Sequence, residues 1–209
     1  MLMLDDDHWV RAIDPVHTDK SIAGVGLCRS FARTLTARNP SITIGLIPCA
    51  VGGSALSQWE ADGELYARAV KRTLKAMESG TLRGILWHHG ETDAAQMGTS
   101  QTYGDRLAAM IPQLRDDLHS SDVPLLVGQL GDFVVLNPKY LFAAAINHDT
   151  KEIPYRVEST ACVDPQGLGH RGDRIHFSRE AVEELGKRYA LAIEKLQSIQ
   201  TVNAAEAGP

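Results

Sequence analysis

The chain has 209 residues, 44 % of them hydrophobic and 22 % charged, a balance that excludes a disordered or collagen-like protein and fits one domain. Its 21 basic residues against 26 acidic ones give a formal net charge of −5 without any Lys/Arg cluster, which argues against a nucleic-acid or anionic-membrane partner. No apolar run approaches the roughly 20 residues that a membrane span needs, and three scattered cysteines are too few for a disulfide scaffold or a metal knuckle. An enzyme or a small-molecule binder remains.

The first half of the chain alternates between helix and strand patterns. A helix is predicted over residues 25–38, and the apolar run 42–48 predicts a buried strand. An apolar stripe at helical spacing follows over 66–77, and the next apolar run, 84–88, predicts a second strand. Because these runs are apolar on both faces, they suit the interior of a parallel sheet.

The second half continues the alternation. A helical stripe over residues 107–118 precedes a strand predicted at 124–130, and a weaker strand is predicted at 157–163. The last helix is predicted over 182–196, with Ser178 placed as its N-cap.

This alternation predicts an α/β fold, a three-layer α/β/α sandwich with a mainly parallel, flavodoxin-like sheet. Neither a repeat nor a linker interrupts the pattern, so residues 1–199 are predicted to form one domain with a frayed tail over 200–209. Ligands of open α/β sheets bind at the carboxyl ends of the strands. The segments that follow strands are therefore the ones to search for chemistry.

The first such segment contains the pair Gly52-Gly53. Two glycines directly after a strand allow the backbone to approach a ligand and to present N–H groups to an oxyanion, although a flexible turn is the ordinary alternative. Ser54 does not fit the hydrolase elbow G-x-S-x-G, because Leu56 occupies the last glycine position. Trp59 could stack on a sugar or lie in the core.

The second segment places four polar side chains at the end of a strand: His88, His89, Glu91 and Asp93. A metal site is one interpretation, but adjacent histidines on a strand point to opposite faces and the HExxH motif is absent, so the spacing makes a poor chelate. A donor that polarises a substrate oxygen fits better. The alternative for Glu91 and Asp93 is a hydrogen-bonded network that ties the loop to the sheet.

The third segment combines a glycine-rich stretch with the spacing Asp173-x-x-His176. The stretch 167–172 matches G-x-G-x-x-G, but no helix opens on it, so a dinucleotide cofactor is not expected. A turn can bring the Asp173 carboxylate to one imidazole nitrogen of His176 and leave the other free as a general base. His170 is interpreted as a solvated loop histidine.

These three segments, in this order, resemble the SGNH-hydrolase superfamily, and more narrowly the sialate O-acetylesterase domain and carbohydrate esterase family 6, which includes acetyl xylan esterases. That group carries G-G-[ST], W-x-Q-G-E-[ST]-D and D-x-x-H-[FL]-[ST] motifs. Their counterparts here are residues 52–54, 87–93 and 173–178. The resemblance covers residues 2–196.

The resemblance implies serine-type hydrolysis of O-acetyl esters of carbohydrates, without metal or cofactor, on a small-molecule or polysaccharide substrate. It assigns the base to His176 and the orienting carboxylate to Asp173. The oxyanion hole falls on the backbone N–H of Gly53 and on the side chain of His89, where the family commonly has Gln. The pocket residues that it implies are Ser54, Trp59, His88, Glu91 and Asp93.

The family's nucleophile lies in a G-Q-S-N segment at the end of the first, central strand, upstream of the region that matches residues 4–9. The 209 residues contain no such segment. We therefore expect this chain to lack the central strand and the nucleophile, as a truncated gene product would, and to be inactive alone. None of Ser21, Ser30 and Ser54 is expected to replace the nucleophile.

Two alternatives remain open. One is a non-catalytic carbohydrate- or ester-binding module that retains Gly53, Trp59 and His89. The other is a metal-dependent hydrolase that uses both histidines of the second segment together with Asp93 and His176. Residues 1–7 carry no signal-peptide pattern, and the sequence assigns neither a compartment nor an oligomeric state.

Overall fold

A computed structural model describes the backbone of residues 1–206 and the side chains of residues 1–199. The strands are β1 (Leu2–Asp5), β2 (His8–Arg11), β3 (Gly45–Leu46), β4 (Ile85–His88), β5 (Leu125–Gly128) and β6 (Thr160–Val163). The helices are α1 (Leu27–Arg38), the 3-10 turn η1 (Leu56–Gln58), α2 (Glu64–Met77), α3 (Glu91–Ala94), α4 (Met97–Gln101), α5 (Tyr103–Asp117), α6 (Asp132–Val135), α7 (Ala143–Arg156) and α8 (Arg179–Glu206).

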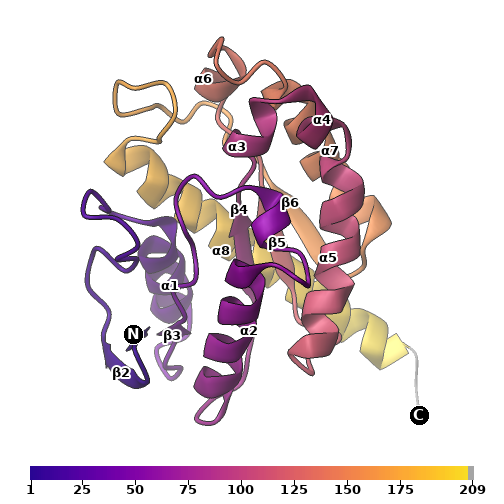
Figure 1. Cartoon of the computed structure of the whole chain (residues 1–209). Helices are drawn as coiled ribbons and strands as arrows, with labels where there is room; N and C mark the ends of the chain where they lie inside the picture. The colour runs from indigo at the N-terminus through magenta and orange to yellow at the C-terminus, as the bar shows by residue number, and fades with distance from the viewer. Residues whose placement is uncertain (207–209) are drawn as a thin grey trace.

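The strands form two three-stranded sheets in an α/β arrangement (Figure 1). In one sheet, β1 pairs antiparallel with β2 and parallel with β3. In the other, β4, β5 and β6 are all parallel. The α/β class with parallel strands is confirmed, but no ladder joins β3 to β4 within the described part of the chain, so the sheet is divided at that point.

The central strand of the parallel sheet, β5, explains the layering. All four of its residues are buried, and successive side chains point to opposite faces. Leu125 and Val127 enter the core shared with α5 and α7, whereas Leu126 enters the core shared with α1 and α8. Helices therefore cover both faces of this sheet, with α8 crossing behind the strands in Figure 1.

Local capping decides where the last helix begins. The Ser178 hydroxyl accepts a hydrogen bond from the backbone N–H of Ala181 at 3.2 Å, which confirms the predicted N-cap. The helix is longer than its apolar stripe predicted, because α8 continues to Glu206. The frayed tail predicted over 200–209 is thus helical up to that residue, and 207–209 lie outside the described residues.

The hairpin of β1 and β2 and the helix α7 are among the elements that the sequence analysis did not predict. The hairpin of β1 and β2 turns at Asp6, which takes a left-handed φ of 44°, a conformation that Asp tolerates well. Helix α7 was missed although its buried residues, Ala143, Ile146, Thr150 and Ile153, follow helical spacing. Within the described residues no helix has both the length and the apolar character of a membrane span.

Candidate active site

The loop between β6 and α8 folds into a tight hairpin that brings Asp173 beside His176. The backbone N–H of Ser178 donates to the carbonyl of Gly169 at 3.0 Å and closes the hairpin at its base. At its tip the chain reverses through left-handed conformations at Gly172 (φ 112°) and Arg174 (φ 56°). The i,i+3 spacing of the acid and the histidine is thereby converted into direct contact.

The Asp173–His176 pair has the geometry of an oriented imidazole. Oδ2 of Asp173 lies 2.7 Å from Nδ1 of His176, and Oδ1 accepts the backbone N–H groups of Ile175 and His176 at 2.9 Å each. Arg171 Nε donates to Oδ2 at 2.8 Å. With the carboxylate ionised, Nδ1 carries the proton, and Nε2, which has no partner in the described part of the chain, is left with a lone pair. The His176 side chain is 59 % exposed, so this lone pair faces a reachable space.

These hydrogen bonds also set the charge of the acid. Burial would raise the pKa of Asp173, but the donors from the His176 backbone and ring, from Arg171 and from Ile175 outweigh burial and hold that pKa well below its usual value. Asp173 is therefore ionised at neutral pH.

Replacing Asp173 with asparagine should cost about 1 kcal/mol of unfolding free energy at pH 7, because the charge-assisted hydrogen bonds are lost from a half-exposed site. A depressed pKa in the folded state stabilises above the unfolded pKa of about 3.9 and ceases to do so as the pH falls through the folded value. The gap between the Asp173→Asn variant and the unmodified protein should therefore shrink between pH 7 and pH 3 in urea unfolding. Asp62→Asn, at an exposed carboxylate, is the control; a gap of constant size at Asp173 would contradict the assignment.

His170 holds this hairpin instead of being free in solvent. Its Nδ1 accepts the backbone N–H groups of Gly172 at 2.9 Å and of Arg174 at 3.3 Å. Its ring also packs on Phe133, with 5.3 Å between centroids. The interpretation of His170 as a solvated loop histidine was wrong, because it anchors the turn that carries Asp173 and His176.

The Gly52-Gly53 pair lies in the loop between β3 and η1. Gly52 donates its N–H to Oδ2 of Asp19 at 2.8 Å, and Gly53 takes a left-handed φ of 77° that glycine adopts without strain. The carbonyl of Gly53 accepts the Thr92 hydroxyl at 3.1 Å. The N–H of Gly53 has no partner among the described residues, so it is the donor in this loop that is available to a ligand.

Ser54 and Trp59 hold each other inside the protein. The Ser54 hydroxyl donates to the carbonyl of Val51 at 2.8 Å and accepts the Trp59 indole N–H at 2.9 Å. Each residue is 7 % exposed, and Trp59 packs edge-on against Trp87 at 5.6 Å. The sugar-stacking interpretation of Trp59 is corrected accordingly: its indole is part of the core, and Ser54 is bound to it.

Both ring nitrogens of His89 are engaged. Nε2 lies 3.0 Å from the Ser54 carbonyl, which can only accept, so Nε2 carries the proton; Nδ1 lies 3.2 Å from the Tyr103 hydroxyl, and the two rings stack. Burial lowers the pKa of His89, against the opposing effect of Asp93, and so favours the neutral ring. As an oxyanion donor, His89 would first have to release the Ser54 carbonyl.

His88 points to the opposite face of β4. Its Nδ1 lies 3.2 Å from the Tyr189 hydroxyl, which itself donates to the Trp87 carbonyl at 2.9 Å, so Nδ1 is the donor in this contact. Nε2 is buried without a hydrogen-bond partner. Burial, together with the charge of His89, lowers the pKa of His88 to about 4, so the ring is neutral at pH 7.

Glu91 and Asp93 both lie on the short helix α3, but they differ in burial and in the groups they contact. Asp93 is 1 % exposed, and its Oδ2 accepts the backbone N–H of Leu56 at 3.0 Å, so it fastens η1 to α3 from inside the protein. Glu91 is half-buried; burial raises the pKa of its carboxyl, and the nearby His176 opposes that effect more weakly. Helix α3 thus connects the glycine loop to the Asp173–His176 hairpin.

Three of the four side chains of the metal hypothesis are hydrogen-bonded to other protein groups, and the fourth, His176, lies in a different loop beside Asp173. The rings of His88 and His89 bond Tyr189, Tyr103 and the Ser54 carbonyl, while Asp93 bonds Leu56. Among the residues whose side chains are described, no three His, Cys, Asp or Glu residues are arranged to hold a metal ion.

Two residues that sequence reasoning missed support the site from α5. Tyr103 is fully buried, and its single hydroxyl proton is shared between two acceptors of His89, the carbonyl oxygen at 3.1 Å and Nδ1 at 3.2 Å. Arg106 forms a two-pronged ion pair with Glu60 at 2.6 and 3.0 Å and lies 4.0 Å from Asp93. Both contacts join residues that are far apart in the sequence, so no local sequence pattern predicts the roles of Tyr103 and Arg106.

The chain is similar in sequence and fold to known carbohydrate esterases. A family model described as carbohydrate esterase, sialic acid-specific acetylesterase, matches residues 1–195. A probable carbohydrate esterase of Arabidopsis thaliana is 31 % identical over 193 residues, which are 90 % of this chain and 71 % of that protein. The X-ray structure of that plant protein superposes with a TM-score of 0.85 at 30 % identity, covering 93 % of this chain and 80 % of the plant chain. A carbohydrate acetylesterase from Xanthomonas citri shares the fold, with a TM-score of 0.68 at 24 % identity over 81 % of this chain and 40 % of that one.

Proposed function

Because the chain belongs to the sialic acid-specific acetylesterase family of carbohydrate esterases, we propose that its site serves the serine-type hydrolysis of O-acetyl esters on carbohydrates. The observation that carries the proposal is the Asp173–His176 contact of 2.7 Å with Nε2 of the histidine left open. An imidazole held by a carboxylate at one nitrogen and open at the other is the general base of serine hydrolysis.

Each part of the site has a defined task. Nε2 of His176 takes the proton of the attacking hydroxyl while that oxygen forms its bond to the acetyl carbonyl carbon, and it later gives the proton to the departing sugar oxygen. A water molecule then releases acetate from the acyl group by the same proton transfers. Asp173 stabilises the imidazolium that forms at each step, and the Gly53 N–H donates to the oxyanion.

The proposal assigns the acid–base part of the reaction to these 209 residues and leaves the attacking hydroxyl unassigned. The Ser54 hydroxyl is bound to Val51 and Trp59, and the sequence contains no Gly-Gln-Ser-Asn segment. The binding-module alternative has less support, because Trp59 and His89, two of the groups it needs, are turned into the protein.

We expect the 209-residue chain alone to hydrolyse p-nitrophenyl acetate no faster than its His176→Ala variant, since a base without an attacking hydroxyl does not form an acyl-enzyme. His148→Ala, at an exposed histidine on α7, is the control for nonspecific imidazole catalysis. Turnover that disappears only with His176 would show that the chain supplies its own nucleophile. Loss of such turnover on addition of EDTA would favour the metal-dependent alternative.

A further inference from the structure

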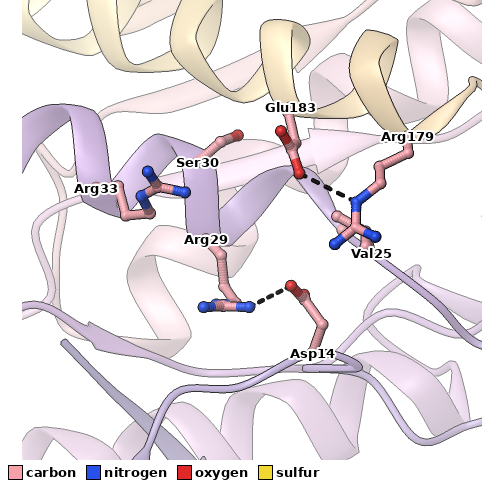
Figure 2. A pocket seen from close by; sticks show the side chains of 8 residues that line it. Asp14, Val25, Arg29, Ser30, Arg33, Arg179 and Glu183 are labelled. Carbon is pink, nitrogen blue, oxygen red and sulfur yellow. Dashed lines mark hydrogen bonds and ion pairs between the residues drawn. The ribbon is translucent and has the colours of Figure 1, made fainter.

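A cavity of about 180 Å³ lies between the start of α1 and the start of α8, beside the loop that carries Asp14 (Figure 2). None of the residues that line it belongs to the candidate active site. Three of the lining side chains are arginines, Arg29, Arg33 and Arg179, and two are acids, Asp14 and Glu183. The cavity therefore carries one more positive charge than negative.

The two acids do not pair with all of the N–H donors of the three guanidinium groups. Arg29 pairs with Asp14, and Arg179 reaches Glu183 only through a 3.4 Å contact at Nε. Arg33 has no acidic partner among the residues with described side chains. Figure 2 shows Arg29 and Arg33 on α1 and Arg179 on α8, all three of which line the cavity. Because each guanidinium presents several N–H donors in a planar fork, most donors at this cavity are left for another acceptor.

One of these donors is buried, although the Arg29 side chain as a whole is 30 % exposed and Arg33 and Arg179 reach solvent. Nε of Arg29 is buried without a hydrogen-bond partner. A buried donor with no acceptor costs free energy, and an oxygen-rich ligand in the cavity would remove part of that cost.

The backbone adds donors of its own. Helix α1 has 12 residues, and its N-cap, Gly26, lines the cavity without offering a side-chain acceptor to the helix. The first turn of α1 contains no acidic residue. The free N–H groups and the positive end of the helix dipole are therefore uncompensated where the arginines gather.

We infer that this cavity binds a small oxyanion, either a phosphate or a carboxylate group, between Arg29, Arg33 and Arg179. Both anions match the planar fork of arginine through paired N–H···O bonds, and both fit the space available. Arg33 is the residue that discriminates, because it has no acid to neutralise it. The inference is independent of the esterase proposal, since it shares no residue with that site.

Calorimetric titration with inorganic phosphate, at an ionic strength held constant with chloride, tests the site. We expect saturable binding by the unmodified protein, about tenfold weaker binding by Arg33→Met, and unchanged binding by Arg38→Met, which removes an arginine from the far end of the same helix. Circular dichroism verifies that both variants are folded. A parallel titration with acetate distinguishes a phosphate site from a carboxylate site.

Thermal unfolding supplies a second measurement, because a ligand that binds only the folded state raises Tm. Phosphate or acetate should raise Tm above the chloride control in the unmodified protein, and by less in Arg33→Met. The inference is overturned if neither anion binds beyond the chloride control, or if Arg33→Met binds as tightly as the unmodified protein.

Discussion

Replacement of Gly186 with alanine is expected to lower the unfolding free energy by about 3 kcal/mol in urea denaturation. A Cβ atom at this position would lie 1.9 Å from the Ser30 hydroxyl and 2.2 Å from the backbone carbonyl of Leu27. The hydroxyl can rotate away, but the carbonyl belongs to α1 and moves only with that helix. The substitution therefore separates α1 from α8, and the loss of their packing outweighs the better helix propensity of alanine.

Gly98 offers a matched control, because it lies in helix α4 and a Cβ there would meet nothing within 4 Å. Gly98→Ala should leave the stability unchanged or raise it by up to about 1 kcal/mol. Equal losses at the two positions would show that the close approach of α1 to α8 does not depend on Gly186. Gly186→Ala should also weaken phosphate binding, because the cavity of Figure 2 lies between the starts of α1 and α8.

The parts of the fold that the sequence predicted are those whose signal is local. The strands β4 and β5 come from continuous apolar runs, and α8 comes from an apolar stripe with Ser178 before it. The order of the strands is different in kind, because it depends on pairing between distant segments. The run 42–48 is mostly apolar, yet only Gly45–Leu46 forms a strand, and β1 pairs with just those two residues.

In the candidate site too, local contacts could be predicted from the sequence and contacts between distant segments could not. Contact between Asp173 and His176 could be predicted because they are three positions apart in the sequence and a turn suffices to join them. The roles of Glu91 and Asp93 could not, because the motif places both on one short helix and only the packing of η1 decides which is buried. The donor capacity of His89 depends likewise on the Ser54 carbonyl, which lies 35 residues away in the sequence.

Asp93→Ala is expected to cost about 3 kcal/mol of unfolding free energy and to loosen the loop that carries Gly53. Leu56 is fully buried, and its N–H has the Asp93 carboxylate as its acceptor at 3.0 Å. Alanine leaves that donor unsatisfied and opens a small cavity, and both effects destabilise. Amide exchange at Leu56 should accelerate with the loss of the hydrogen bond.

Asp93→Asn separates the hydrogen bond from the charge. The amide oxygen can still accept the Leu56 N–H, so this variant should lose less than half of what alanine loses, and its Leu56 amide should remain protected. The surface ion pair of Asp105 with Arg156 provides the control, because Asp105 is 82 % exposed and Asp105→Ala should change stability by less than about 0.5 kcal/mol. If asparagine were as damaging as alanine, the 4.0 Å approach of Arg106 to the carboxylate would be the more important contact. If neither substitution affected stability or exchange, Asp93 would not fasten η1 to α3, and the position of the Gly53 donor would have to be set by Thr92 and Asp19 alone.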